Sequence, residues 1–367
     1  MPAVILIGAS AMAIPLIHEA HALDLKVIAT DGDPAAPGFA HADERLIIST
    51  YEATQTATLL RHLADQYAYR GVVCCGADVA PTVATVAQTY QLPGIPAHIA
   101  SQTHDKGIVR FVLDTGLSCY QPYWQAYDRA LPSDALDALL AKVGYPLVVK
   151  PRTQRASRGV SLVNTRDELM DAIAKADRYG RHMLLERRLF GSEHSAEAIL
   201  QDGTLLWFNI VDRLFDYASG TPIELGHINP TSLDAKIQQQ IQLMLLSCAR
   251  LLGVTWGPFK VDCMVTDDGP KVLEVTARLS GGWDCQRTSP MTGRNPIRQL
   301  LQLACGLPVD AQPPAQGYAA CAAVLPTQPL AHNGERQAFV FTHGDDAALA
   351  WQTALAQAHA MPSASVG

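Results

Sequence analysis

Five side chains suited to metal and phosphate chemistry are spaced two residues apart in two neighbouring runs of the chain. FKVDCMV carries Lys260 and Asp262, and KVLEVTAR carries Glu274, Thr276 and Arg278. The intervening TDDGP predicts a tight turn, because Asp and Gly accept the backbone angles that hairpin turns need. Side chains two positions apart on a strand point to the same face. The spacing therefore predicts a β-hairpin with one polar face.

The position of the turn decides which of these side chains meet. A turn centred on the second Asp places Asp262 opposite Glu274 and Lys260 opposite Thr276. Facing carboxylates destabilise a sheet by up to about 1 kcal/mol, so a cation between them is the economical explanation. Oxygen ligands beside Lys and Arg favour Mg²⁺ with a bound phosphate over zinc. A solvated polar face, with the two cations pairing with the acids, is the alternative that the hairpin alone leaves open. The opposite face is predicted to be apolar and to carry Val261, Cys263, Val265, Leu273, Val275 and Ala277.

The composition is that of an ordinary globular protein. With 367 residues, of which 48% are hydrophobic and 17% charged, the chain is long enough for two or three domains. The net charge of -7 and the lack of a basic tail argue against nucleic-acid and membrane partners. The first apolar run ends at Gly8, too short for a signal peptide or a membrane span, so we expect a cytoplasmic protein. Eight cysteines without a CxxC pair, and no HExxH, argue against a zinc site.

The order of the predicted elements divides the chain into four parts. Residues 1–117 alternate short β-branched runs with helical runs, which favours a parallel sheet covered by helices. Residues 118–187 and 188–310 mix strands and helices in the manner of two α+β lobes. AQPPAQG opens residues 311–367 and is typical of a linker, so a small C-terminal subdomain is expected after it.

Four motifs in succession resemble one known superfamily. Asp105 and Lys106 precede a helical stretch, YPLVVKP puts Lys150 at a strand end, LLERRLFGSEHS follows, and the hairpin comes last. This order resembles the ATP-grasp superfamily of ADP-forming ligases, which includes D-alanyl ligases, biotin carboxylase and carbamoyl phosphate synthetase. The resemblance covers residues 1–310 and implies an α/β and α+β architecture. In this ATP-grasp fold, a Rossmann-like N-terminal domain precedes two α+β lobes that hold ATP between them.

The resemblance also implies which residues bind the nucleotide. Lys106 and Lys150 match the two lysines that hold the phosphates, a task for compact ammonium groups. RTQRASRG, which contains Ser157, takes the place of the phosphate-covering loop. It departs from the family in keeping a single glycine among three arginines, which suggests guanidinium contacts or a stiffer lid in place of the usual backbone cradle. Glu186 and Leu189 bound the stretch that matches the adenine-binding hinge. Glu193 matches the acid that accepts the ribose hydroxyls.

The hairpin residues acquire roles from the same resemblance. Asp262 and Glu274 match the Mg²⁺ carboxylates, with Mn²⁺ as an alternative ion. Thr276 stands where the family commonly has Asn, and a hydroxyl is a weaker ligand, so a second metal stays an open question. Lys260 and Arg278 match positions that would stabilise a developing oxyanion and are the predicted catalytic residues.

The segment after the hairpin is the predicted substrate pocket. LSGGWDCQRTSPMTGRNP is glycine-rich and polar, and its glycines let the backbone approach a small ligand. Trp283 and Asp284 would line the pocket, with Asp284 holding an ammonium group. Arg287 or Arg294 would hold a carboxylate, as an amino-acid substrate requires.

These assignments predict an ATP-dependent carboxylate-amine ligase. It would phosphorylate a carboxylate to an acyl phosphate and couple it to an amine, releasing ADP and phosphate, with an amino acid or small metabolite as substrate. Two alternatives stay open: a carboxylating relative that uses bicarbonate, and a nucleotide-binding regulatory protein without catalysis. The expected partners are therefore a small-molecule acid and amine, and the resemblance adds a homodimer as an option.

Overall fold

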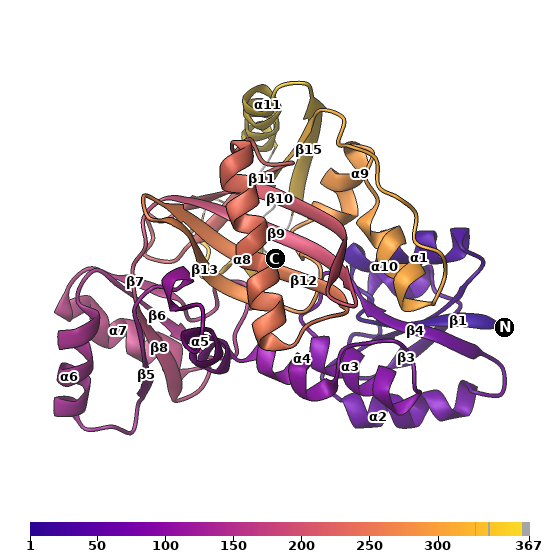
Figure 1. Ribbon diagram of the computed structural model, residues 1–367, viewed down its shortest axis with the longest axis horizontal. Helices are drawn as coiled ribbons and strands as arrows, with labels where there is room; N and C mark the ends of the chain where they lie inside the picture. Colours follow the sequence, from indigo (N-terminus) through magenta and orange to yellow (C-terminus); the bar gives the residue numbers. More distant parts are fainter. Residues whose placement is uncertain (327, 337, 362–367) are drawn as a thin grey trace.

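The computed structural model describes residues 1–326, 328–336 and 338–361, which form three sheets with helices packed against them (Figure 1). A parallel sheet near the N-terminus lies at the lower right of the view and a small antiparallel lobe at the lower left. A seven-stranded sheet lies between and above them. An α/β unit followed by α+β lobes is the predicted fold class, and the structure confirms it.

The N-terminal sheet is buried on both faces. All of its pairings are parallel, in the order β3-β2-β1-β4. The inner strand β1 is a continuous apolar run, as is typical of a strand that faces no solvent. Its alternate residues pack into two separate hydrophobic cores, one on each face of the sheet. The strands are β1 (Pro2–Ile7), β2 (Lys26–Asp31), β3 (Glu44–Ile47) and β4 (Ala68–Cys74). The covering helices are α2 (Ala53–Leu60) and α3 (Ala80–Thr89) on one face, and α1 (Ile14–Ala22) and α10 (Pro296–Ala304) on the other.

Two further helices join this domain to the rest of the molecule, α4 (Ala97–His104) and α5 (Lys106–Asp114). Asp105 caps α5, because its carboxylate accepts hydrogen bonds from the backbone N–H of Gly107 at 2.8 Å and of Ile108 at 3.2 Å. The same carboxylate receives Arg152 from the small lobe at 2.6 Å. The cap therefore fixes where Lys106 stands relative to the small lobe.

The small lobe is a four-stranded antiparallel sheet in the order β5-β8-β6-β7. Two amphipathic helices bury their apolar sides against one of its faces. The strands are β5 (Trp124–Asp128), β6 (Leu147–Pro151), β7 (Ser161–Val163) and β8 (His182–Arg187). The helices are α6 (Ser133–Val143) and α7 (Arg166–Asp177).

The seven-stranded sheet has the order β13-β12-β9-β10-β11-β14-β15. The strands are β9 (Ser192–Gln201), β10 (Thr204–Asp216), β11 (Ile223–Asn229), β12 (Gly257–Thr266), β13 (Gly269–Thr276), β14 (Tyr318–Val324) and β15 (Ala338–Gly344). Helix α8 (Ala235–Leu252) covers one face, from its Asp234 cap to the left-handed Gly253. Helix α11 (Ala347–Ala360) packs on β14 and β15. The two C-terminal strands thus continue the sheet of residues 192–276.

Short helical turns lie between the longer elements. The 3₁₀ turns are Ala11–Ala13, Pro37–Ala40, Arg61–Leu63, Ser118–Tyr120 and Asn333–Glu335. Residues Asp284–Thr288 form a single π-helical turn that runs into α9 (Ser289–Met291).

The hairpin of β12 and β13 has the predicted register at its far end and a different one near its turn. Asp262 lies opposite Glu274 and Lys260 opposite Thr276, as expected. Between Asp262 and Cys263 a β-bulge shifts the pairing by one residue. As a consequence Val272 enters the core and Leu273 lines a cavity, so the prediction that Leu273 belongs to the apolar face was wrong.

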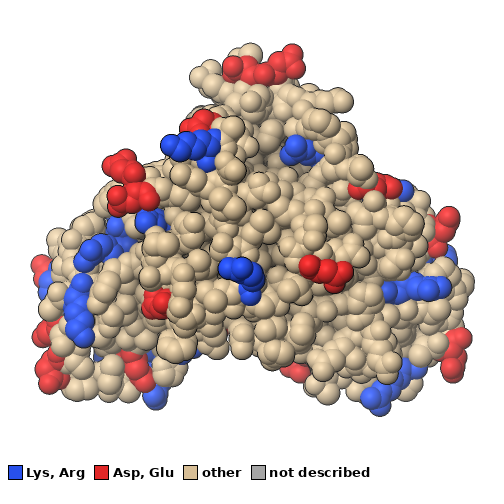
Figure 2. Space-filling view, in the orientation of Figure 1, with Lys and Arg blue, Asp and Glu red and all other residues tan. Residues whose placement is uncertain are grey.

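The surface has no large region of one charge in the view of Figure 2, and the cysteines, all within the described residues, form no disulfide. On the face shown in Figure 2, basic and acidic side chains are interspersed over a mostly uncharged surface. All eight cysteines are free thiols, and only Cys119 is exposed. Within the described ranges, no helix combines the length and apolar character needed to cross a membrane.

Candidate functional site

A cavity of about 580 Å³ opens where the three sheets approach one another. The N-terminal domain contributes Met12 and Asp78, and the small lobe contributes Lys150. The hairpin supplies its polar face, and the segment between β14 and β15 supplies Asn333. Eleven predicted site residues line this cavity: Lys106, Lys150, Ser157, Glu186, Leu189, Glu193, Lys260, Asp262, Glu274, Thr276 and Arg278.

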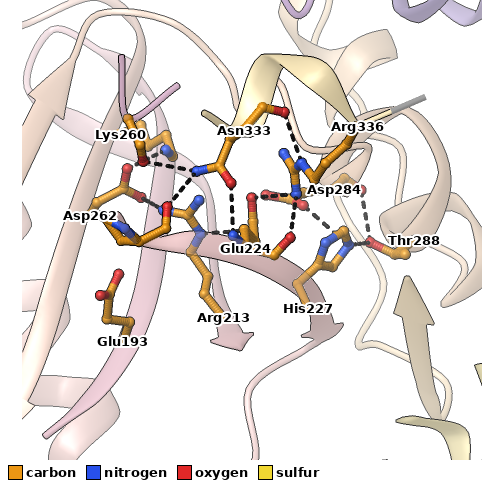
Figure 3. A network of polar contacts seen from close by, with 12 residues as sticks. Glu193, Arg213, Glu224, His227, Lys260, Asp262, Asp284, Thr288, Asn333 and Arg336 are labelled. Carbon is orange, nitrogen blue, oxygen red and sulfur yellow. Dashed lines mark hydrogen bonds and ion pairs between the residues drawn. The ribbon is translucent and has the colours of Figure 1, made fainter. Parts of the chain in front are cut away.

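Asp262 belongs to a chain of ion pairs in the cavity wall (Figure 3). Lys260 lies 2.7 Å from one of its oxygens and Arg213 lies 3.1 Å from the other. Arg213 is held in turn by Glu224 at 3.0 Å, and Glu224 also binds Arg336 at 3.0 Å. Burial opposes the charge of Asp262, but the two cations outweigh it and hold the pKa of this carboxyl below its usual range. Asp262 is therefore a carboxylate at neutral pH.

The donor set around the hairpin suits a hard divalent cation. The Oδ1 of Asp262 and the Oγ1 of Thr276 are buried and have no hydrogen-bond partner among the described residues. Arg213 is near Asp262 Oδ1 only as an ion pair, without hydrogen-bond geometry. The described residues form no group of three acidic, His or Cys side chains that could hold a metal alone. Two carboxylates and a hydroxyl fit Mg²⁺, which keeps water and phosphate oxygens as its other ligands.

A second buried ion pair joins α5, β8 and β6. Arg110 binds both oxygens of Glu186, at 2.9 and 3.0 Å, and Lys150 binds the same carboxylate at 2.8 Å. Arg110 also donates to the backbone carbonyls of Val272 and Leu273, at 2.9 and 3.0 Å. Sequence reasoning missed Arg110, although a cation within the apolar face of α5 was a visible signal. The bonds to Glu186, Val272 and Leu273 tie the small lobe to the bulge beside Glu274.

Lys150 is expected to make nucleotide affinity depend on pH. Burial is the main influence and lowers the pKa of this lysine to about 8, although Glu186 opposes the shift. A neutral amine does not attract phosphate, so affinity for an ATP analogue should fall as pH rises through about 8, by up to about tenfold per pH unit. Lys150→Arg, whose guanidinium stays charged, should remove that decline. Dissociation constants measured by calorimetry across this range test it, and equal slopes for the two proteins would contradict it.

Two other cations of the cavity are also paired. Lys106, at the start of α5, lies 2.9 Å from Glu274. Arg278 lies 3.2 Å from Asp78, which has His104 at 3.5 Å on its other side. Burial raises the pKa of Asp78, but Arg278 and His104 lower it by more. Asp78 follows β4 at the carboxyl edge of the parallel sheet, so the N-terminal domain sets the orientation of Arg278.

Glu193 occupies another part of the cavity. It lies near the start of β9 and accepts a hydrogen bond from the hydroxyl of Tyr217 on β10. Burial raises the pKa of Glu193 above its usual range, although the charge of Arg213 opposes the shift. Leu189 and the backbone that follows β8 line the same region.

The loop between β6 and β7 is fastened by the C-terminal segment. Asn333 donates its backbone N–H to the Ala156 carbonyl at 3.0 Å and its amide to Ser157 Oγ at 2.9 Å. Its Oδ1 accepts the backbone N–H of Glu224 at 2.7 Å. Ala156 and Ser157 both have left-handed backbone, with φ of 53° and 58°, which costs about 1–2 kcal/mol per residue. The Asn333 contacts offset part of that cost and hold the loop over the cavity.

Removing this fastening should loosen the loop. For Asn333→Ala, we expect trypsin to cleave after Arg155 or Arg158 about tenfold faster, because the left-handed turn loses hydrogen bonds that hold it. Timed digestion with mass spectrometry measures this rate. Asn164→Ala is the control, since Asn164 is exposed in the same lobe and bonds only to Glu168 through its side chain. Unchanged cleavage at the loop would contradict this role.

The four predicted substrate residues are not among those that line the cavity. Trp283 packs near Phe339 and Phe341, with ring centroids 6.3 and 6.0 Å apart. Arg287 is exposed over Phe341. The other two are in a buried polar network: Asp284 lies 3.1 Å from His227, and Arg294 donates to Asn209 at 2.9 Å. The neighbouring Gly281 and Gly282 do line the cavity, and the substrate role of these four residues stays a prediction.

Comparison with known proteins identifies the domain around this cavity. Residues 143–287 match the family model described as "ATP-grasp domain". The chain contains an ATP-grasp domain. This match confirms the resemblance seen in the motif order, and it spans Lys150, Glu193 and the hairpin. Lys106, Asp78 and Asn333 lie outside it, so the ATP-grasp segment forms only part of the cavity wall.

Relatives and solved structures agree with the ATP-grasp assignment. A D-alanine–D-alanine ligase of Desulforamulus reducens is 31% identical over 153 residues, which are 40% of this chain and 48% of that protein. The chain spans about half the length of the curated relatives it matches. An ADP complex of purK, an N5-carboxyaminoimidazole ribonucleotide synthetase, superimposes with a TM-score of 0.78 at 15% identity, over 98% of this chain and 96% of that one. An L-amino acid ligase from Bacillus licheniformis gives a TM-score of 0.70 at 21% identity, over 89% and 80%. The predicted ATP-grasp fold is thereby confirmed.

Proposed function

We propose that this protein is an ATP-dependent ligase that activates a carboxylate as an acyl phosphate and couples it to an amine. One observation carries the proposal: a single cavity is lined by the hairpin carboxylates, by two lysines from different domains and by Arg278. Phosphoryl transfer requires mainly such positioning and charge stabilisation, and no protein nucleophile. The D-alanine–D-alanine ligases among the curated relatives support the same class of reaction.

The nucleotide would extend between the small lobe and the hairpin. The backbone between Glu186 and Leu189 would pair with the base, and Glu193 would accept the ribose hydroxyls, as carboxylates do with vicinal diols. Lys106 and Lys150 would bind the phosphates, with the loop around Ser157 above them. Because these lysines belong to different domains, phosphate binding would also hold the domains together. The ADP complex of purK and an ATP complex of a carboxyaminoimidazole ribonucleotide synthase support a nucleotide in this fold.

Asp262, Glu274 and Thr276 would hold Mg²⁺, or Mn²⁺ in its place. The ion supplies neutralisation of phosphate charge when it is bound. In the structure Lys106 is paired with Glu274 and Arg213 with Asp262, so these carboxylates would be shared between the cations and Mg²⁺ when the ion binds. The phosphates of the nucleotide would offer the two cations additional partners. Thr276 contributes a hydroxyl oxygen in place of an amide oxygen, and its orphaned position supports a ligand there.

The reaction balances without any further co-reactant. A carboxylate oxygen of the acid attacks the γ-phosphorus of ATP, the bond to the β-phosphate oxygen breaks, and ADP leaves. The amine nitrogen then attacks the acyl carbon, the bond to phosphate breaks, and an amide, inorganic phosphate and a proton result. Lys260 and Arg278 would stabilise the oxyanion that develops on the acyl group. An amino acid or a small metabolite is the proposed acid, and Asp284, Arg287, Arg294 and Trp283 are kept as proposed substrate residues.

Coupled measurement of ADP release tests this function. Purified protein is incubated with ATP, Mg²⁺ and pools of amino acids and other small acids, with and without bicarbonate. We expect ADP and phosphate to form only when an acid and an amine are both present, with an amide product detectable by mass spectrometry. Turnover that requires bicarbonate would replace the proposal with a carboxylating activity. ATP binding without turnover in any pool would replace it with a regulatory role.

A further inference from the structure

The cavity carries more positive charge than its own acids compensate. Its lining includes ten Lys or Arg side chains and six Asp or Glu side chains. Six of the cations have a carboxylate within 4.0 Å: Lys106, Lys150, Arg213, Lys260, Arg278 and Arg336. The other four have none among the described residues. Arg187 donates to backbone carbonyls and Arg188 lies over two aromatic rings, whereas Arg155 and Arg158 flank the turn of the loop between β6 and β7. A nucleotide with one Mg²⁺ would cancel roughly half of the excess. The remaining charge points to a second anion.

The guanidinium groups of Arg155 and Arg158 have preset positions. They flank the left-handed Ala156 and Ser157, and Asn333 binds both of these residues. A segment far away in sequence thus holds the turn that presents Arg155 and Arg158 to the cavity (Figure 3 shows Asn333 beside the ion-pair chain). Such preorganisation lowers the entropic cost of binding a ligand.

The contacts of Arg155 place it on the side of the N-terminal domain. Its guanidinium carbon lies 4.9 Å from the ring centre of Tyr51, which follows β3. Arg278 is tied to Asp78 of the same domain. Burial lowers the pKa of Arg155, and the charges of Arg158 and Arg278 lower it further, so both of these guanidinium groups repel that of Arg155. Glu193, the proposed ribose-binding acid, lies on β9 of the seven-stranded sheet, where it accepts a hydrogen bond from Tyr217 of β10. Among the described residues, it does not share the contacts of Arg155 with the N-terminal domain.

We propose that Arg155 and Arg158 bind a second anionic group of the acid substrate, beside Arg278, which serves the reacting acyl group. The substrate is then a carboxylic acid with a phosphate monoester or a further carboxylate. This inference rests on the proposed function, because it assigns the substrate of that same site. Guanidinium groups match both kinds of anion with paired donors. A second anionic group beside Arg155 relieves the repulsion that its guanidinium feels, whereas an acid whose only anionic group is the reacting carboxylate leaves Arg155 and Arg158 without an anionic partner. Charge at this end of the cavity thereby sets the choice of acid.

Anion binding to the nucleotide-loaded protein tests the site without turnover. A non-hydrolysable ATP analogue with Mg²⁺ fills the nucleotide site, including the place of the transferred phosphate, and inorganic phosphate is then titrated by calorimetry. We expect phosphate to bind, and its affinity to fall about tenfold to hundredfold in Arg155→Gln and in Arg158→Gln. Arg181→Gln is the matched control, because Arg181 is an exposed arginine of the same lobe paired with Asp128.

Several outcomes would overturn the inference. Phosphate that binds the free protein but not the analogue-loaded protein would make these arginines triphosphate ligands. If Arg155→Gln and Arg158→Gln lose as much affinity for the ATP analogue as for phosphate, the two arginines are likewise ligands of the triphosphate. Phosphate binding that is absent, or equal in wild type, Arg155→Gln and Arg158→Gln, would remove the site altogether.

ADP release with matched acids separates the two kinds of anion. Phosphoserine is compared with serine, and succinate with butyrate, each with a pooled amine. We expect the dianionic member of one pair to be favoured at least about tenfold in kcat/KM, and the preference to disappear in Arg155→Gln. Equal use of both members of both pairs would contradict the inference. If no acid supports ADP release while phosphate binding and its loss in the variants persist, the proposed ligase function fails and the anion site stands.

Discussion

Asp262→Asn is expected to lower ATP-dependent ADP release by at least about 10²–10³-fold while the protein stays folded. The substitution keeps the shape of the side chain and removes the charge that would hold the metal. It also leaves Lys260 and Arg213 without their shared acid in a buried site. The assay is ADP release at saturating ATP over a range of Mg²⁺ concentrations, with circular dichroism to verify folding. Excess Mg²⁺ should not restore the rate, because the missing ligand is a carboxylate oxygen.

Asp268→Asn is the control for this prediction. Asp268 is in the turn of the same hairpin and is exposed to solvent, so its amide variant should keep the wild-type rate. A variant at 262 that retains more than about a tenth of the rate would contradict a metal-binding role for this acid, since loss of one such electrostatic contact costs at least about tenfold.

Glu186→Gln is expected to destabilise the fold by about 3–5 kcal/mol, the usual result of removing one partner from a buried ion pair. Glu186 is 3% exposed and binds Arg110 and Lys150, so the amide would leave two buried cations without a counter-charge. Burial raises its pKa, yet the two cations dominate and lower it to about 2. A carboxyl whose pKa is lowered by folding contributes stability above its unfolded pKa, near 4.5, and loses it as pH falls toward 2.

Urea unfolding of both proteins between about pH 3 and 7 measures the effect. The stability of the wild type should decline across the acid range, and the decline should be shallower in Glu186→Gln. Asp137→Asn is the control, because Asp137 forms an exposed ion pair with Arg166 in the same lobe, and such pairs contribute about 0–1 kcal/mol. If Glu186→Gln lowers the free energy of unfolding by less than about 1 kcal/mol, the buried ion pairs of Glu186 contribute no more than an exposed pair does.

The sequence was sufficient for the features that depend on local pattern. Alternation and turn chemistry predicted the hairpin and the pairing of Asp262 with Glu274. The alternation of short β-branched and helical runs in residues 1–117 predicted a parallel sheet covered by helices. The motif order led to eleven residues that line one cavity, because a motif fixes both a residue type and a place on an element.

Features that depend on distant contacts could not be predicted in this way. The bulge at Leu273 inserts one residue into β13 and shifts the pairing by one residue between it and the turn. The apolar alternation of the sequence is compatible with a hairpin with or without this bulge. Arg213 and Arg336 meet at Glu224 only when β10, β11 and the C-terminal segment come together. Asn333 reaches Ser157 across 176 positions of the chain. Nothing in the local composition of these segments indicates such neighbours.

The pairing of β14 with β11 makes the C-terminal segment inseparable from the rest of the protein. A chain cut after residue 310 would leave β11 as an open sheet edge, with unpaired N–H and C=O groups that favour aggregation. The cut would also take Asn333 and Arg336 out of the cavity wall. Grafting the loop around Ser157 onto a relative would therefore require the segment that carries Asn333, with β14 and β15, to move together with it.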